Sequence, residues 1–350
     1  MKAIQLTAVG QPLEIREVPR PSPAEDQVLV RVAGCGVCHT DIGFWKDGVP
    51  TRHGLPLTLG HEVSGIVVET GPAHRHWMNR EVIVPSVIPC GACDLCRSGR
   101  GNICRAQLMP GNDMDGGFAE VIAVPARGLC VVDARDGYEL SELSVIADAV
   151  TTPYQAIVRS GLGAGDLAIV VGVGGVGTYA VQIAAAMGAR VVAIDVDDAR
   201  LDLLARHGAG LTIDSSQIDF KSLKKQVQAR AREWGCPEHG WKVYECSGHP
   251  GGQETAYGLL TYAGTLMVVG FTLAKSELRL SNVMAFDATI QGTWGCKPEL
   301  YPEALAMVTS GTITLKPFIE RHPMSRGPAV LQQVVDHQIE RRVVLEPERF

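Results

Sequence analysis

The segment AIVVGVGGVGTYAVQIAAAMGARVVAID constrains the fold of this chain more than any other part of the sequence. It opens with a short apolar, β-branched run that is typical of a buried strand. Glycines then follow with the spacing G-x-G-x-x-G at Gly172, Gly174 and Gly177. A small-residue stretch typical of a helix comes next, and a second apolar run ends at Asp195. This order of strand, glycine turn, helix and strand predicts a βαβ unit of a parallel sheet.

The same segment predicts a dinucleotide site. The residues expected to bind the cofactor here are Gly172, Gly174, Gly175, Val176, Gly177 and Asp195. Glycines allow the tight turn, the approach of a pyrophosphate to the helix N-terminus, and close packing of helix on strand. The Asp195 carboxylate would bind the adenosine ribose hydroxyls and repel a 2′-phosphate, which favours NAD over NADP. The alternative is a glycine-rich turn in a plain βαβ unit.

Further elements alternate along the rest of this region. Helices are expected over 198–207 and 220–233, and strands near 211–213 and in KVYECSG, TLMVVGF and ATIQGTW. Val269 and Gly270, which follow the TLMV run, are also predicted to contact the cofactor. Residues 153–294 are therefore predicted to form a doubly wound α/β nucleotide domain of the Rossmann type. Residues 1–152, rich in glycine and proline with short strands, predict a β-rich domain that residues 295–350 complete.

Four cysteines lie in the short segment PCGACDLCRSGRGNIC, with the spacing C-x2-C-x2-C-x7-C. They are Cys90, Cys93, Cys96 and Cys104. Thiolates so spaced on a coiled loop can close a tetrahedral zinc shell with no open position, which predicts a structural zinc ion. An iron–sulfur cluster and unrelated loop cysteines are the alternatives.

Charge and composition exclude several classes of partner. The net charge is −6 and the basic residues are scattered, so no nucleic-acid partner is expected. Ten cysteines without an apolar secretory segment favour a reducing compartment, the cytoplasm. The uncharged stretch 167–189 is interrupted by glycines, so we expect no membrane span and no membrane partner.

A second group of candidate metal ligands lies earlier in the chain. Cys38 occurs in GCGVCHTD and His61 in LGHEVSG, each at the end of an apolar, strand-like run. A single buried cysteine or histidine is usually a core residue. Because polar neighbours surround both, we interpret them as part of a site carried by loops.

With these motifs in this order, the chain resembles the zinc-dependent medium-chain alcohol dehydrogenases. GVCHTD, GHE at 60–62, the four-cysteine loop and the glycine fingerprint occur in that family's order over essentially the full length. The resemblance implies a GroES-like β-rich catalytic domain and a Rossmann domain. It also implies NAD as cofactor and two zinc ions per chain, one catalytic and one structural.

The resemblance assigns roles around the catalytic zinc. Cys38 and His61 match two ligands, and Asp148 in DAVTTPY stands where many members have a ligating cysteine. A helix-capping aspartate is the alternative for Asp148. Three protein ligands leave a fourth position for the alcohol oxygen, whose pKa the ion lowers so that hydride can leave. Glu62 would lie beside the metal, and Asp41 would orient His61.

Other residues match positions that serve the proton and the cofactor. Thr40 matches the hydroxyl that contacts the substrate oxygen and begins a proton relay, and His39 matches a position facing the cofactor pyrophosphate. Gly43 replaces the histidine that ends this relay in many relatives. The group that takes the proton onward is therefore unassigned, and water is one candidate. Arg342 matches a pyrophosphate-binding arginine, with the adjacent Arg341 as the alternative.

Six segments resemble one subgroup more narrowly. They are RHGLPLTLGHEVSG, ICRAQLMPGNDMDGGFAE, VPARGLCVVDA, ADAVTTPYQA, RLSNVMAFDA and TWGCKPELYPEAL. This subgroup oxidises the ring hydroxyl of the CoA thioester 6-hydroxycyclohex-1-ene-1-carbonyl-CoA to the 6-oxo product in anaerobic benzoyl-CoA degradation.

Several alternatives stay open. They are a general zinc dehydrogenase for small primary or secondary alcohols, a zinc-free reductase on the same fold, and an inactive protein that binds zinc and NAD. The resemblance also implies a homodimer or homotetramer joined through the nucleotide domain.

Overall fold

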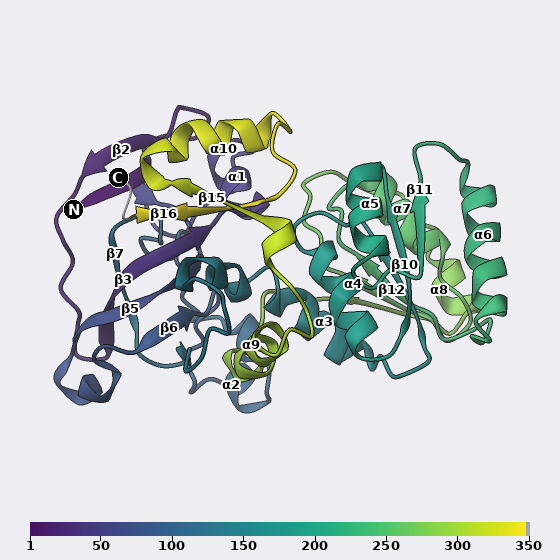
Figure 1. Cartoon of the computed structure of the whole chain (residues 1–350), viewed down its shortest axis with the longest axis horizontal. Helices are drawn as coiled ribbons and strands as arrows, with labels where there is room; N and C mark the ends of the chain where they lie inside the picture. The colour runs from purple at the N-terminus through teal and green to yellow at the C-terminus, as the bar shows by residue number, and fades with distance from the viewer. Residues whose placement is uncertain (348–350) are drawn as a thin grey trace. The chain divides into compact units, whose positions relative to one another are not determined.

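The structure is a computed structural model that describes residues 1–347. The chain divides into two compact units. The first unit contains residues 1–151 and the C-terminal segment from Gly295 onward, and the second contains residues 152–294. In Figure 1 the yellow C-terminal elements lie among the purple and blue strands of the first unit.

The first unit is built mainly from antiparallel strands. A small sheet has the order β2-β1-β4, with β1 at Lys2–Leu6, β2 at Glu14–Glu17 and β4 at Leu57–Thr58. A larger sheet has the order β15-β16-β3-β5-β6-β8, and β7 also pairs with β3. Its strands are β3 (Gln27–Gly36), β5 (Glu62–Thr70), β6 (Glu81–Val84), β7 (Val121–Pro125), β8 (Cys130–Val131), β15 (Ile319–Pro323) and β16 (Arg342–Glu346). The C-terminal strand β16 therefore pairs with β3 from the start of the chain.

Short helices surround these sheets. The α-helices are α1 (His39–Trp45), α2 (Asp94–Arg97), α9 (Tyr301–Thr309) and α10 (Gly327–Val335). The 3-10 helices are η1 (Pro72–Trp77), η2 (Gly101–Ile103), η3 (Leu140–Ala147), η4 (Pro298–Leu300), η5 (Lys316–Phe318) and η6 (Met324–Arg326). The helix η3 packs against β3 and β5, and its C-cap Asp148 lies beside Cys38, just beyond the end of β3.

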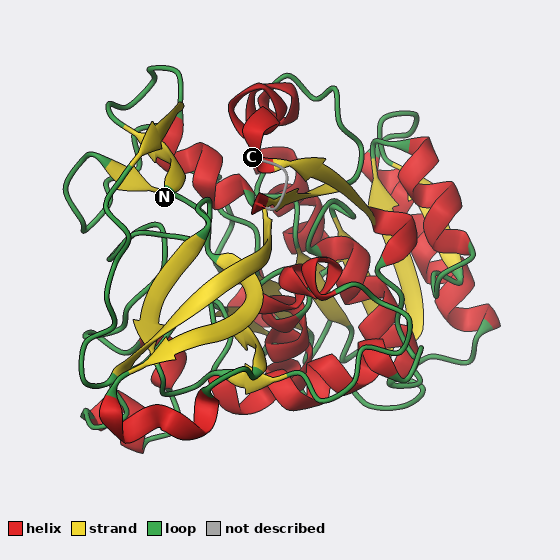
Figure 2. Ribbon diagram, turned by 60° about the vertical axis from the view of Figure 1, so that its left-hand side comes forward, coloured by secondary structure: helices red, strands yellow, loops and turns green. Residues whose placement is uncertain are grey.

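The second unit contains a six-stranded parallel sheet of order β11-β10-β9-β12-β13-β14. Its strands are β9 (Leu167–Val171), β10 (Arg190–Asp195), β11 (Leu211–Asp214), β12 (Lys242–Glu245), β13 (Thr265–Val268) and β14 (Thr289–Gly292). Its helices are α3 (Thr151–Ser160), α4 (Gly177–Ala186), α5 (Asp198–Ala205), α6 (Phe220–Glu233), α7 (Pro250–Gly258) and α8 (Ser281–Ala285). Figure 2 distinguishes these helices (red) from the strands (yellow). The strand order reverses direction next to β9, which confirms the predicted doubly wound sheet.

Local sequence explains these elements well. The helix α6 begins after Asp219, whose carboxylate accepts the backbone N–H of Ser222 at 2.7 Å. Leu223, Val227 and Ala231 recur every four residues and are all buried, as an amphipathic helix requires. All five residues of β9 are buried, as expected for a central strand covered on both faces.

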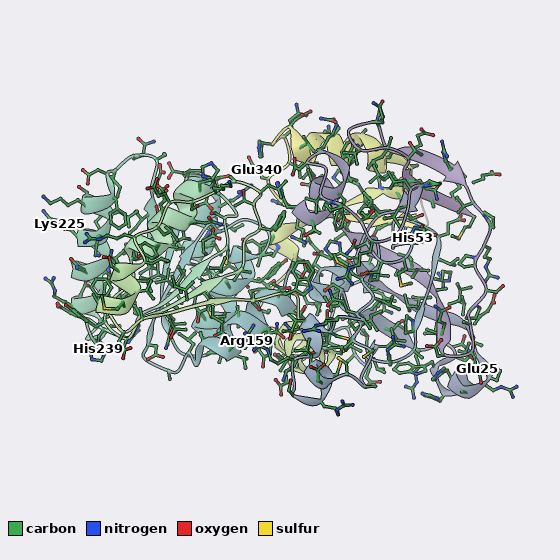
Figure 3. The ribbon with its side chains drawn as sticks, turned by 180° about the vertical axis from the view of Figure 1, so that it is seen from behind. Glu25, His53, Arg159, Lys225, His239 and Glu340 are labelled. Atoms are coloured by element: carbon green, nitrogen blue, oxygen red, sulfur yellow. The ribbon has the colours of Figure 1, made fainter. Side chains whose placement is uncertain are left out.

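The surface carries dispersed charge. Side chains such as Glu25, Lys225, His239 and Glu340 are exposed and come from separate parts of the chain (Figure 3). None of the helices within residues 1–347 is long and apolar enough to cross a membrane.

Candidate metal centres and dinucleotide site

Strand pairing brings Cys38 and His61 together. Cys38 lies just beyond the end of β3 and is the N-cap of α1, and His61 directly precedes β5. The antiparallel register pairs Gly36 with Glu62, so the two ligand candidates lie at the same end of adjacent strands. The cysteine and the histidine are both buried.

Asp148 completes this group from a different element. It is the C-cap of η3, and its Oδ2 lies 3.6 Å from Cys38 Sγ and 3.6 Å from His61 Nε2. A tetrahedral zinc ion with ordinary bond lengths places such ligand atoms about 3.4–3.6 Å apart. Together with Glu62, these residues form a group whose ligand atoms all lie within 4.8 Å of one another. Thiolate, imidazole and carboxylate with this geometry fit one zinc ion.

Asp41 connects the two loops that carry the ligands. Its Oδ2 accepts the Cys38 N–H at 2.9 Å, and its Oδ1 accepts the Gly60 N–H at 3.1 Å. The same Oδ1 lies 3.3 Å from His61 Nδ1. Burial lowers the pKa of His61, but the charge of Asp41 and the hydrogen bonds to Asp148 and Asp41 outweigh it, so that this pKa lies well above its ordinary value. A metal ion bound at His61 would therefore displace a proton.

Glu62 and Arg342 form a buried ion pair beside the ligands. Arg342 Nε donates to Glu62 Oε2 at 2.9 Å, and Nη2 donates to Oε1. Burial raises the pKa of Glu62 to about 7, although the arginine opposes the rise. We predict a pyrophosphate contact for Arg342, and the structure places its guanidinium on Glu62. The pair joins residues at opposite ends of the chain, and no local sequence signal indicated it.

The two remaining residues predicted on this loop lie at the start of α1. Thr40 is partly buried, and its Oγ1 lies 3.7 Å from Cys38 Sγ. His39 is the first residue of the helix, and its side chain is exposed. Gly43 is buried within the same helix. Thr40 is thus adjacent to the ligand group, as the predicted proton-transfer role requires.

The four-cysteine loop folds into a second cluster. Cys93 Sγ lies 3.5 Å from Cys96 Sγ and 3.6 Å from Cys104 Sγ, and the Cys90 and Cys96 sulfurs are 3.9 Å apart. A tetrahedral zinc ion holds its sulfurs about 3.8 Å apart. The backbone N–H of Ala92 donates to the Cys90 sulfur and lowers the pKa of that thiol to about 6, which favours the thiolate. This cage fits a single ion with four protein ligands.

The glycine fingerprint forms the turn between β9 and α4. Gly172 has φ +84°, and a side chain there would lie 2.4 Å from the Ser247 backbone. A side chain at Gly177 would lie 1.9 Å from the Gly172 carbonyl oxygen. Only glycine therefore fits at these two positions. Gly174, Gly175 and Val176 lie between them, and Val176 is the N-cap of α4.

Asp195 supports this turn with its side chain. Its Oδ2 accepts the Val173 N–H at 2.5 Å, and its Oδ1 accepts the Val196 N–H at 2.7 Å. Sequence reasoning missed Arg200, whose Nη1 lies 3.9 Å from the point where a side chain at Gly174 would begin. A basic residue shortly after the aspartate was the available signal. The glycine turn therefore lies beside the guanidinium of Arg200 from α5, which also pairs with Asp197, and backbone amides and guanidinium groups both bind phosphates.

Val269 and Gly270 lie where β13 ends. Their backbone N–H groups both donate to the Glu245 carbonyl oxygen at 2.9 Å. They therefore extend the carboxyl edge of the parallel sheet, where nucleotides bind in such folds.

A cavity of about 510 Å³ lies elsewhere in the first unit. It is lined by Arg31, Ala33, Ile66, Glu81, Arg135, Glu139, Leu140, Ser141, Arg321 and Glu346. Its acidic groups already pair with arginines: Arg135 with Glu81, and Arg321 with Glu346. None of the predicted site residues lines this cavity.

Comparison with known proteins identifies the family to which the chain is similar. Residues 24–134 match the alcohol dehydrogenase GroES-like domain, and residues 175–310 match the zinc-binding dehydrogenase family. An alcohol dehydrogenase of Geobacillus stearothermophilus is 32% identical over 349 residues, covering 99% of both chains. An L-threonine 3-dehydrogenase of Bacillus licheniformis is 31% identical over 333 residues, covering 93% of this chain and 92% of its own. The solved alcohol dehydrogenase of Aeropyrum pernix superposes with a TM-score of 0.88 at 27% identity, covering 99% of this chain and 100% of its own.

Proposed function

This chain belongs to the zinc-dependent medium-chain alcohol dehydrogenases, and we propose that it oxidises the ring hydroxyl of 6-hydroxycyclohex-1-ene-1-carbonyl-CoA to the 6-oxo thioester. Zinc-dependent oxidation of an alcohol with a nicotinamide cofactor is the activity of the family, and NAD is the cofactor of this chain. The CoA thioester is our assignment within it, and the six sequence segments quoted above support it. Gly43, in place of the relay histidine, also fits that subgroup.

The convergence of Cys38, His61 and Asp148 is the observation that carries the catalytic part of the proposal. We assign them as the three ligands of the catalytic zinc and the four cysteines as the ligands of the structural zinc. When bound, the catalytic ion supplies a Lewis acid that lowers the pKa of the alcohol, while NAD accepts the hydride. Arg342 holds the Glu62 carboxylate in an ion pair, so we do not assign Glu62 as a ligand, and the alcohol oxygen would bind beside the three assigned residues.

The proton of the alcohol needs an acceptor close to the ligands. Thr40 Oγ1 is the hydroxyl in that place, and we assign it the first step of proton transfer. Gly43 has no side chain to continue the relay, so water takes the proton onward. Asp41 keeps His61 oriented while the metal is bound.

The second unit provides the cofactor site. The amides of the glycine turn and the N-terminus of α4 suit the pyrophosphate. We assign the Asp195 carboxylate to the adenosine ribose, where its charge disfavours the 2′-phosphate of NADP.

A general activity toward small secondary alcohols is the second candidate. The similarity to an L-threonine 3-dehydrogenase favours it, because that name denotes oxidation at carbon 3 of a small amino acid. The two candidates share the zinc chemistry and differ only in the substrate.

We also propose that the protein forms a homodimer or homotetramer through the second unit. Among the described strands, β14 pairs with β13 alone, so it is an edge strand. Leu280, Met284 and Ile290 nearby are exposed by 69%, 76% and 38%. Of these residues only Ile290 lies on β14, whereas Leu280 and Met284 belong to α8 and its N-cap; an unpaired strand edge and exposed apolar side chains are places where a second copy can bind. Sedimentation of the purified protein tests this assignment.

The substrate test follows the absorbance of reduced nicotinamide. The purified zinc-loaded protein is mixed with NAD and 6-hydroxycyclohex-1-ene-1-carbonyl-CoA, and in parallel with simple cyclic and linear alcohols. We expect selective turnover of the thioester. Turnover of the simple alcohols alone would contradict the thioester assignment and support the general activity toward small secondary alcohols. No turnover of any of these compounds would favour an inactive zinc- and NAD-binding protein.

A further inference from the structure

Tyr301 lies between the segments that carry the two metal clusters. It is the first residue of α9, and its side chain is completely buried. Its hydroxyl accepts the Ser86 backbone N–H at 3.1 Å and donates to the Ala147 carbonyl oxygen. The phenol therefore uses its proton as well as its oxygen in defined contacts with the backbone.

Both contacts are next to metal-binding positions. Ala147 is the last residue of η3 and directly precedes Asp148. Ser86 lies four residues before Cys90, on the segment that leads from β6 into the four-cysteine loop. A single buried hydroxyl thus joins the backbone beside the catalytic ligand to the backbone that enters the structural cluster.

The Ala147 carbonyl is held by two donors. Thr151 Oγ1 donates to it at 3.2 Å, in addition to the Tyr301 hydroxyl. Because this carbonyl belongs to the peptide that joins Ala147 to Asp148, the two bonds fix the plane of that peptide. Asp148 itself has non-helical backbone angles (φ −141°, ψ −56°), so η3 does not continue through it. The direction of its side chain therefore depends on this anchored peptide.

The phenol remains protonated in this place. Burial raises the pKa of Tyr301 above its ordinary value, so the hydroxyl keeps the proton that it donates to the Ala147 oxygen. Replacement by phenylalanine removes this donor and leaves the ring in the core.

We propose that Tyr301 is a positioning residue, which holds the Asp148 carboxylate at the catalytic metal through the Ala147 carbonyl. This inference rests on the proposed function, in which Asp148 is a zinc ligand. Outer partners of metal ligands typically change metal affinity or activity by 10- to 100-fold. Since Thr151 still holds the same carbonyl, we expect an effect near the lower end of that range.

The test uses the full-length Tyr301→Phe protein loaded with zinc. Zinc retained per chain is measured at rising chelator concentration, and the cobalt-substituted protein is examined by its visible absorption. We expect the catalytic ion to be lost at about a tenfold lower chelator concentration, with the cobalt bands shifted. The ion of the four-cysteine loop should be retained as in the unmodified protein.

Tyr138→Phe is the matched control. The Tyr138 hydroxyl also bonds the C-terminal segment, accepting the Leu315 N–H at 3.2 Å and contacting Thr314 Oγ1, and neither residue belongs to a metal group. We expect this variant to release zinc like the unmodified protein. Equal release from the Tyr138→Phe and Tyr301→Phe proteins would overturn the positioning role.

Two further variants separate the inference from the proposal on which it rests. Thr151→Val removes the second donor to the same carbonyl, and it decides the matter if Tyr301→Phe does not fold. Easier loss of the catalytic zinc from Thr151→Val would support the anchored peptide, and unchanged loss would overturn it.

Asp148→Asn is expected to lose the catalytic zinc. If Asp148→Asn keeps both zinc ions, Asp148 is not a ligand and the inference falls with that assignment. If Asp148→Asn loses one ion while Tyr301→Phe and Thr151→Val release zinc like the unmodified protein, only the positioning role falls.

Discussion

The two metal clusters of the first unit are assembled in opposite ways. The structural cluster takes its four sulfurs from residues 90–104, within one loop. The catalytic cluster takes its ligands from the end of β3, the start of β5 and the end of η3, at Cys38, His61 and Asp148. Their ligand atoms nevertheless lie at similar distances, 3.5–3.9 Å between sulfurs in the loop and 3.6 Å from Asp148 Oδ2 to both Cys38 Sγ and His61 Nε2. Ligand atoms can therefore be brought to similar distances either by their spacing along the chain or by the tertiary fold.

This difference in construction corresponds to a difference in expected role. A loop with few apolar side chains depends on its ion for its shape, so removal of the metal should affect folding. The catalytic ligands are held by buried strands and by Asp41, so that site should survive loss of its ion. The predictions below test whether the two clusters separate in this way.

The largest effect is expected at the catalytic cluster. Cys38→Ser or His61→Ala should remove one zinc ion per chain and lower alcohol oxidation by more than about 100-fold, since even outer partners of a ligand change activity by 10- to 100-fold. NAD binding and the second zinc should be retained. Metal analysis, turnover and NAD titration of the same preparation provide the measurement. Full activity after the loss of one zinc would contradict the assignment.

The structural cluster should instead respond in stability. Cys93→Ser opens the cage, and we expect the unfolding temperature to fall by about 10 °C, corresponding to a loss of about 3 kcal/mol or more. Cys130→Ser is the control, because Cys130 is a cysteine of the first unit that belongs to neither cluster; it is buried, whereas Cys93 is half-buried. Thermal unfolding of both variants is compared with that of the unmodified protein. A fully stable and active Cys93→Ser variant would remove the distinction between the two clusters.

The dinucleotide site is a third case, since its motif is local like that of the cysteine loop. Asp195→Asn keeps an acceptor for the Val173 N–H and removes the charge. We expect the preference for NAD over NADP to fall by about tenfold, which corresponds to about 1.4 kcal/mol. The ratio of kcat/KM for the two cofactors measures this preference. Asp195→Ala also removes the hydrogen-bond acceptor for the Val173 N–H, so the difference between the two variants reports the contribution of that bond to cofactor use. An unchanged ratio would mean that the carboxylate does not face the ribose.

The last prediction isolates burial without a metal, at a pH far from that of the other tests. Burial raises the pKa of Cys130 to about 11 from an ordinary 9.0. Between these values the native thiol keeps its proton while the unfolded chain has released it, so stability should fall as the pH rises from 9 to 11. The loss amounts to about 2–3 kcal/mol. The free energy of unfolding, measured with urea from pH 9 to 11, should decline less steeply for Cys130→Ser than for the unmodified protein. Identical slopes of this free energy against pH would exclude the effect.

Sequence reasoning predicted most where neighbours along the chain carry the information. The helix over residues 220–233 and the parallel sheet around the glycine turn appear as predicted. The four sulfurs cluster as their spacing indicates. The pairing of Glu62 with Arg342 could not be found in this way, because the two residues are 280 positions apart and either one alone is an ordinary charged residue.

The sequence by itself determined the nature of the two units, the glycine turn, the composition of the cysteine cage and, through its resemblance, the identity of the candidate ligands. Only the tertiary structure decided which atoms meet. It places Asp148 beside Cys38 and His61, directs Arg342 to Glu62, and buries the Tyr301 hydroxyl between Ser86 and Ala147. The physical reason is that turns, caps and short loops depend on neighbouring residues, whereas contacts between distant segments depend on strand register and on the packing of η3 and α9.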